Sequence, residues 1–433
     1  MNEKFLHYIW KLQYFDKKEL NTVSGEPVVI LHPGILNTDA GPDFLNAKVK
    51  IGDITWFGNI EIHIRSSDWK LHQHADDTAY NNVILHVVYS DDQPARRDNG
   101  SILPVVELKN RISESLIRKY KTIDDSTEEI PCGKHLKGVD AIHKLTMIER
   151  ALMERLETKS LLIKELLKKN TNDWQETTYQ LLARNFGFKI NSDPFLKLAQ
   201  RVPLKYLLQQ RDSLFKLEAI LFGQAGLLDD SCQDQYPKEL KKEYEFQGRK
   251  LKLEYKKMET CEWKFLRVRP ANFPTIRIAE YASLIYQCPE FLTDFFEIKS
   301  FDQVKESLKK IQVSAYWKEH YVFDIVSDKK KSLGLGEESF RNILINTIVP
   351  LLFTYGKLHD NEEMVDKAVF FLNNTSAEDN RILRLWAKSD MNPKNAFDAQ
   401  GLLEMYHSYC AKKNCLKCEI GSKIMVSEMM QAV

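Results

Sequence analysis

The periodicity of the hydrophobic residues changes once along this chain of 433 residues. Between residues 26 and 108, β-branched and aromatic residues form short runs separated by Gly and Asp, as in EPVVILHPG and NNVILHVVY. Such runs are typical of strands. From about residue 140 onward, apolar residues recur at helical spacing, as in DAIHKLTMIERALMERLETKSLLIKELLKKN. The sequence therefore predicts an α+β protein with a mixed sheet first and a larger helical region after it.

The length of the chain exceeds that of one ordinary hydrophobic core, so more than one domain is expected. The polar stretch 122–138 is the natural boundary. We expect an α/β domain over residues 1–125, opened by a helix at residues 4–20, and an irregular all-helical domain over residues 126–433. The helical segments share no fixed repeat length, which argues against a solenoid.

Composition excludes several classes of protein. Hydrophobic residues make up 43% and charged residues 28%, as in soluble globular proteins. No apolar run of membrane-spanning length and no signal-peptide pattern is present, so we expect a cytoplasmic protein without a membrane partner. The net charge of +1 argues against attraction to nucleic acid over the whole surface, although 62 Lys and Arg leave room for a local basic groove. The sequence contains no Gly-rich phosphate loop, so it does not predict an ATP site.

The segment IGDIT, residues 51–55, predicts a β-hairpin, because Gly and Asp separate two apolar strands. Closing the hairpin brings Asp43 back to Glu61 and His63. A plain two-residue loop would pair Asp43 with Ile62 on the apolar face. An odd-length loop, or a bulge near Gly52, would instead pair Asp43 with Glu61 and unite the polar side chains.

Histidines concentrate just after this hairpin, where four of the eleven in the chain fall within 24 residues: His63, His72, His74 and His86. Imidazole serves both proton transfer and metal ligation, and carboxylates bind Mg²⁺ or Mn²⁺. The cluster therefore predicts a site for metal binding or acid/base chemistry. The alternative is that these residues form only the solvated face of a hairpin.

The order of these motifs resembles the core of the PD-(D/E)xK nucleases. The match consists of PDF at residues 42–44, the hairpin, and EIH at residues 61–63. The resemblance implies a restriction-endonuclease-like fold in which Asp43 and Glu61 hold Mg²⁺ or Mn²⁺. His63 stands where that superfamily usually has the lysine that orients or activates the attacking water. Polar residues beyond the second strand are the candidates for substrate binding: Arg65, Ser67, Asp68, His72 and Tyr80.

A second resemblance covers most of the chain. The chain resembles an uncharacterised bacterial family, the domain of unknown function 2851. The similar segments are GPDFLNA, GNIEIHIRSSDW, NNVILHVVY and RPANFPTIRIA, together with the terminal cysteines. This resemblance implies no activity.

Three cysteines near the end of the chain, Cys410, Cys415 and Cys418, have the spacing C-x4-C-x2-C. Three thiols this close can bind Zn²⁺ or an iron–sulfur cluster if a fourth ligand joins them. Cys132 is the leading candidate for that ligand, followed by His407 and His135. The alternative is a set of small buried thiols without metal.

These patterns together favour a metal-dependent nuclease or phosphodiesterase with Asp43, Glu61 and His63 as its catalytic residues. Two alternatives stay open. One is a non-catalytic nucleic-acid-binding or scaffolding protein with a degenerate nuclease-like shell. The other is a zinc or iron enzyme that uses the histidine-rich patch.

Overall fold

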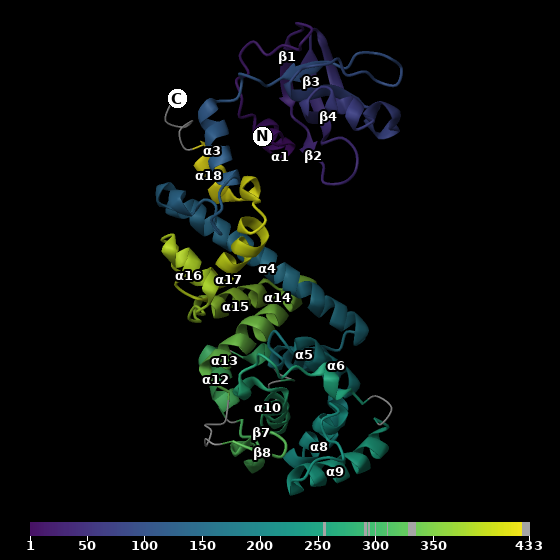
Figure 1. The fold of residues 1–433 in the computed structure, drawn as a ribbon, viewed down its shortest axis with the longest axis vertical. Helices are drawn as coiled ribbons and strands as arrows, with labels where there is room; N and C mark the ends of the chain where they lie inside the picture. The colour runs from purple at the N-terminus through teal and green to yellow at the C-terminus, as the bar shows by residue number, and fades with distance from the viewer. Residues whose placement is uncertain are drawn as a thin grey trace. The chain divides into compact units, whose positions relative to one another are not determined.

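The structure, a computed structural model, describes residues 1–426 except 254–256, 290–291, 293–294, 299, 310 and 328–334 (Figure 1). The chain forms two compact units. Unit 1 contains Met1–Met147, Lys388–Asp390 and Met405–Val433, and unit 2 contains Ile148–Ala387 and Met391–Glu404. The fold is α+β, as the sequence predicts.

Unit 1 is built on one six-stranded mixed sheet in the order β1-β3-β4-β5-β6, with β2 paired to β3. The pairs β1–β3 and β3–β4 are antiparallel, whereas β4–β5 and β5–β6 are parallel. β4 therefore lies between the antiparallel and parallel halves of the sheet. The elements of this unit are α1 (Glu3–Leu12), β1 (Val28–His32), β2 (Ile35–Leu36), β3 (Phe44–Ile51), β4 (Ile54–Arg65), α2 (Asp68–Leu71), η1 (His74–Asp76), η2 (Thr78–Tyr80), β5 (Val83–Ser90), β6 (Val105–Glu107), α3 (Glu114–Asp124), η3 (Gly133–Gly138), η10 (Met405–Cys410), η11 (Cys415–Lys417) and α18 (Glu419–Val426).

The β3–β4 hairpin closes as predicted, through a two-residue turn at Gly52 and Asp53 that joins the pair Ile51–Ile54. The bulge lies elsewhere than expected. Register shifts between Phe44–Ile60 and Ala47–Gly58, so β3 carries one extra residue at Leu45 and Asn46. Asn46 has a φ of +56°, a left-handed conformation that Asn tolerates better than most residues. The expectation of a bulge near Gly52 was wrong in position, although the resulting register is the one that brings Asp43 to Glu61.

Helix α1 is shorter than the sequence predicts. It ends at Leu12 because Gln13 is left-handed, with a φ of +57°, and its N–H bonds back to the carbonyls of Ile9 and Trp10. The expected helix over residues 4–20 was therefore wrong in its second half. Three residues in the middle of α1, Tyr8, Ile9 and Trp10, are buried.

The carboxyl-terminal segment belongs to unit 1 and not to the helical unit. α18 packs against α3, which it meets side by side in Figure 1, and Tyr8 Oη lies 2.9 Å from Ser422 Oγ. Unit 1 thus extends past the expected domain end at residue 125, and it takes in residues that lie far apart in sequence.

Within its described residues, unit 2 is helical apart from one small antiparallel pair, β7 (His320–Val322) and β8 (Ile325–Val326). The expectation of an all-helical region was wrong at that pair. Helix α4 (Ala141–Lys169) contains the boundary between the units. The other helices of the second unit are α5 (Trp174–Phe186), α6 (Ser192–Arg201), α7 (Leu204–Gln209), α8 (Leu214–Gln224), α9 (Gln235–Leu251), η5 (Thr260–Glu262), η6 (Pro270–Asn272), α10 (Pro274–Gln287), η7 (Phe295–Glu297), α12 (Phe301–Lys309), η8 (Ala315–Lys318), α13 (Glu337–Ile343), η9 (Leu344–Ile348), α14 (Val349–Leu358), α15 (Glu362–Asn373), α16 (Arg381–Lys388) and α17 (Ala396–Glu404).

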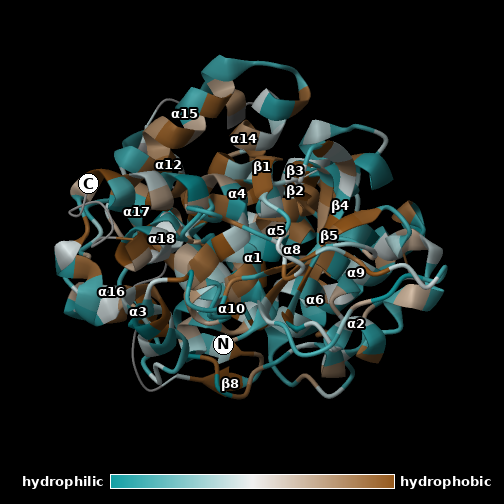
Figure 2. Ribbon diagram, turned by 90° about the horizontal axis from the view of Figure 1, so that it is seen from above, coloured by the Kyte–Doolittle hydropathy of each residue, from teal (hydrophilic) through white to brown (hydrophobic). Residues whose placement is uncertain are grey.

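The helices carry hydrophobic and hydrophilic stretches in alternation, brown and teal in Figure 2, as expected of helices that bury one side. Within the described residues, no helix combines the length and the apolar character needed to cross a membrane.

Candidate metal centre

Asp43 and Glu61 hold the ends of their two strands together. The backbone N–H of Asp43 donates to Glu61 Oε2 over 3.1 Å, and the N–H of Ile62 donates to Asp43 Oδ2 over 2.9 Å. Glu61 is 5% exposed, and burial raises the pKa of its carboxyl, with the charge of Asp43 adding to the effect. A buried carboxylate between strands needs a charged or hydrogen-bonding partner, so its surroundings decide its role.

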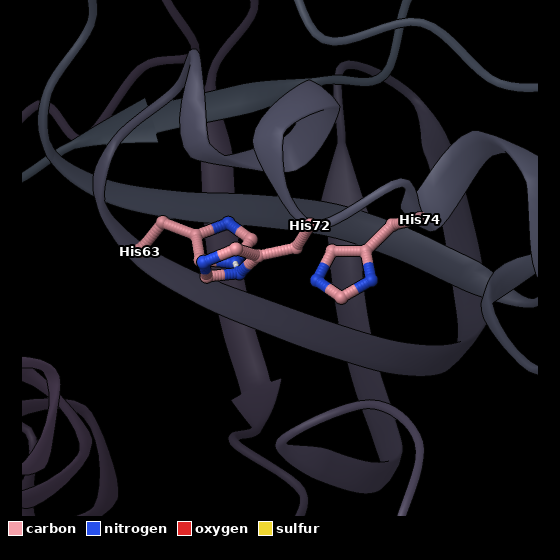
Figure 3. A group of neighbouring side chains, drawn as sticks. All are labelled: His63, His72 and His74. Carbon is pink, nitrogen blue, oxygen red and sulfur yellow. Dashed lines mark hydrogen bonds between the residues drawn. The ribbon is translucent and has the colours of Figure 1, made fainter.

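The rings of His63, His72 and His74 lie together in Figure 3, and two of them, those of His63 and His74, approach Glu61. One nitrogen from each of these rings lies within 4.8 Å of the other two, close enough to surround a single ion. His63 comes from β4, His72 ends α2, and His74 begins η1. The short crossover between the parallel strands β4 and β5 thus folds back over Glu61 and His63 on β4.

Distances within the group connect the histidines to Glu61. His63 Nε2 lies 3.1 Å from His72 Nδ1 and 3.5 Å from Glu61 Oε1. His74 Nε2 lies 3.1 Å from Glu61 Oε1, and this contact lowers the pKa of Glu61 against the effect of burial. Ligand atoms around one metal ion approach one another in this way, since their lone pairs point at the ion and not at each other.

The other ring nitrogen of His63, Nδ1, has a hydrogen-bond partner on β5. His63 Nδ1 lies 2.9 Å from His86 Nε2, and His86, on β5, is fully buried. When Nδ1 of His63 donates to His86, Nε2 of His63 is left with its lone pair facing the group. This is the arrangement by which proteins fix the ring and tautomer of a metal-binding histidine.

Burial makes these two imidazoles neutral. It lowers the pKa of His63 to about 2 and that of His86 to about 3, and neighbouring histidines add to both effects. A neutral imidazole is the form that binds metals. For the same reason, His63 supplies no positive charge to the group.

A fifth imidazole, that of His7 on α1, lies against Asp43. Its Nε2 is 3.1 Å from Asp43 Oδ2, without hydrogen-bond geometry, and its side chain is 22% exposed. Sequence reasoning missed His7 because the position of α1 against the sheet is a tertiary feature. The one local signal is that His7 is a polar residue within the apolar run of that helix.

A small hydrophobic cluster packs against His74. Trp69, 2% exposed, packs with Val83, Ala95 and Leu103, and its ring centroid lies 5.3 Å from that of His74. Tyr80 stacks on His74 at 3.8 Å between ring centroids. Burial and the nearby carboxylates raise the pKa of Tyr80 to about 12, so its hydroxyl stays protonated.

The remaining predicted substrate-binding residues divide into two groups. Ser67 and Asp68 have structural partners, since the Ser67 hydroxyl donates to Asp92 Oδ2 and Asp68 Oδ2 accepts from the N–H of Arg65. Arg65 and His72 are exposed. Of the expected set, His72 and Tyr80 thus join the histidine group, whereas Ser67 and Asp68 shape the loop after β4.

The donor set fits a divalent metal ion. Two buried imidazole nitrogens, those of His7 and His74, lie 3.1 Å from carboxylate oxygens and lack hydrogen-bond partners. A buried nitrogen without a hydrogen-bond partner lowers the stability of the fold unless a proton or a cation binds between it and the carboxylate oxygen. Mixed imidazole and carboxylate ligands suit Mn²⁺, Zn²⁺ or Fe²⁺ better than Mg²⁺, which prefers oxygen alone.

These features define a two-unit α+β protein with a cluster of histidines and carboxylates around β4, the central strand of a mixed sheet. The chain belongs to the family described as Protein of unknown function (DUF2851), whose model matches residues 3–381. No curated protein and no solved structure matches the chain.

Proposed function

We propose that the protein is a divalent-metal-dependent phosphodiesterase that acts on nucleic acid. The observation that carries this proposal is the position of Glu61. Its Oε1 faces the ring nitrogens of His63 and His74, and its Oε2 accepts from the backbone of Asp43.

We assign the metal to His63, His72, His74 and Glu61. Such an ion, when bound, neutralises phosphate charge and activates water for attack. Asp43 fixes the strand that carries Glu61 and adds negative charge next to it. His63 serves as a neutral ligand and not as a substitute for lysine.

His7 is then the group available for proton transfer. Imidazole accepts protons efficiently near neutral pH, and His7 is partly exposed beside Asp43. It lies outside the group of three histidines, so it can exchange protons with water without leaving the metal short of a ligand.

The connection of the elements supports a restriction-endonuclease-like core. A helix precedes three antiparallel strands, β1, β3 and β4, and a crossover leads to β5, which is parallel to β4. Asp43 stands directly before β3, and Glu61 and His63 lie on β4. This is the order of helix, strands and acidic residues that the PD-(D/E)xK resemblance implies.

An exposed strip on the hairpin supports a nucleic-acid substrate. Phe57 is 66% exposed and shares its side of β4 with Glu61, because the two are four positions apart. Lys48 pairs with Phe57, its Nζ 5.0 Å from the ring centroid, and Lys50 lies two positions along β3. Aromatic rings with neighbouring cations are the elements by which proteins hold single strands.

The test is cleavage of labelled single- and double-stranded DNA and RNA by the full chain. The protein is first stripped with a chelator and then supplied with Mn²⁺, Zn²⁺, Fe²⁺ or Mg²⁺. We expect cleavage with Mn²⁺ and loss of both metal and activity in Glu61→Gln. His7→Gln should keep the metal and lose roughly 10²- to 10⁴-fold in rate, the usual contribution of a general base.

The matched control is Glu114→Gln, which changes an exposed carboxylate on α3 and should behave as the wild type. Cleavage that survives Glu61→Gln would show that the activity has another source. A protein that binds metal at this site but cleaves none of the four substrates would exclude the phosphodiesterase assignment.

A second candidate function is a zinc or iron enzyme that acts on a small molecule. It is favoured by the group of three histidines, a ligand set common to such enzymes. One equivalent of tightly bound zinc or iron, lost in His74→Gln, together with inert nucleic-acid substrates, would favour this candidate.

A further inference from the structure

Four cysteines of unit 1 come from two segments of the chain that lie far apart in sequence. Cys132 directly precedes η3, Cys410 ends η10, Cys415 begins η11, and Cys418 directly follows η11. α18 contacts both η3 and η11, so it joins the two segments. None of the four cysteines is in a disulfide.

Each of these thiols lies close enough to the other three to interact with them electrostatically. Cys132 interacts with Cys415 and Cys418, Cys410 interacts with all three others, and Cys415 interacts with Cys418. Cys132, Cys410 and Cys418 are 6%, 8% and 7% exposed, and Cys415 is half-buried. These six electrostatic interactions place the four thiols in one neighbourhood, in which no three of the sulfur atoms lie within 4.8 Å of one another.

The backbone around the thiols is short and irregular. η10 is a π-helical turn, η11 is a single 3-10 turn, and Lys413 between them has a φ of +50°. Gly421 allows a close approach here, since a Cβ at that position would lie 2.2 Å from the carbonyl oxygen of Cys415. Such turns supply little apolar packing of their own, and a cross-link is the usual way to stabilise segments of this kind.

We propose that Cys132, Cys410, Cys415 and Cys418 together bind one thiolate-held metal centre, a zinc ion or an iron–sulfur cluster. The centre fastens the carboxyl-terminal segment to the loop between α3 and α4. Four thiolates and no open position are typical of structural centres and not of catalytic ones. The proposal is independent of the phosphodiesterase site, which shares no residue with it.

The binding step exchanges protons for metal. Cysteine binds a metal as its thiolate, whereas an ordinary thiol without metal carries a proton near neutral pH. Metal binding as thiolates then releases these protons to solvent. The affinity should therefore fall steeply as the pH is lowered.

The test is metal analysis of the full chain purified without oxygen and without chelators. His74→Gln serves as the background, because it removes one proposed ligand of the histidine site. We expect about one equivalent of zinc without colour, or iron with acid-labile sulfide and visible absorption; either result identifies the centre. Cys415→Ser should lose that metal, and Cys261→Ser, at an exposed cysteine, should keep it.

Thiol labelling of the unmutated protein covers the case in which Cys415→Ser fails to fold. Cys261 should react at once, whereas the four proposed ligands should react only after a chelator is added. Immediate labelling of all four, or metal content that Cys415→Ser leaves unchanged, would overturn the proposal. A disulfide among the four in the freshly purified protein would also overturn it.

Discussion

The backbone N–H of Asp43 donates to the carboxylate of Glu61, 18 residues further along the chain, over 3.1 Å. Asp43 returns a bond to the same strand through Oδ2, which accepts from the N–H of Ile62. Each acidic residue therefore accepts a hydrogen bond from the strand end that carries the other, and the two bonds hold both carboxylates in place. This reciprocal pair fixes where Glu61 points, and hence where the histidines can meet it.

Replacing Asp43 separates its structural role from its charge. Asp43→Ala should lower the free energy of unfolding by about 1–3 kcal/mol, because it leaves the buried N–H of Ile62 without an acceptor. Asp43→Asn should retain most of the stability, since its side-chain oxygen still accepts, yet weaken metal binding by removing a charge. Urea unfolding and metal titration of both variants measure the two effects. Equal destabilisation by Ala and Asn would contradict the hydrogen-bond role.

The bulge at Asn46 should respond to side-chain shape. Asn46→Val should cost about 1–2 kcal/mol, because a β-branched residue is strained at positive φ. Asn46→Gly should be close to neutral. Deleting Asn46 removes the extra residue of β3 and leaves Asp43 opposite Glu61, so metal binding should persist. Loss of metal on this deletion, in a protein that still folds, would show that the register described for the hairpin is wrong.

His86 should act on the metal through His63. His86→Leu removes the partner of His63 Nδ1, and loss of such a partner typically weakens metal affinity 10- to 100-fold. Competition with a chelating dye measures the change, and His135→Gln, at an exposed histidine, is the control. An unchanged affinity in folded His86→Leu would mean that the ring of His63 is held by other contacts.

Glu218 on α8 predicts a pH dependence in unit 2. Burial raises its pKa to about 7, while Tyr236 and Ser314 hydrogen-bond to it. Between pH 4.5 and 7 the folded state keeps a proton that the unfolded state releases, so the free energy of unfolding falls as the pH rises. The loss approaches about 3 kcal/mol and is complete above pH 7.

The comparison of Glu218→Gln with the wild type isolates this effect. The variant should lose the slope between pH 4.5 and 7, whereas Glu245→Gln, at an exposed carboxylate, should keep it. Urea unfolding at a series of pH values gives the slopes. Parallel curves for Glu218→Gln and the wild type would show that Glu218 does not hold this proton.

The sequence predicted the sheet, the hairpin at Gly52 and the helical character of unit 2, because each follows from local periodicity and turn residues. The site was predicted less completely. The closeness of His63, His72 and Glu61 could be expected because they lie on or near one strand, where alternation shows which residues share a face. The bulge at Asn46 was misplaced since Asn adopts a left-handed conformation in many contexts. The contact of His7 with Asp43 depends on how a helix packs, which no local pattern encodes.

The return of Met405–Val433 to unit 1 has a consequence for biosynthesis. A chain emerging from the ribosome exposes its sheet and α3 long before α18 exists, and all of unit 2 is made in the interval. The Ser422 partner of Tyr8 and three of the four clustered thiols arrive only with the last segment. Unit 1, although it begins first, can therefore be completed only after translation has passed the whole helical unit. A nonsense mutation late in the reading frame would damage the amino-terminal unit rather than the one next to it in sequence.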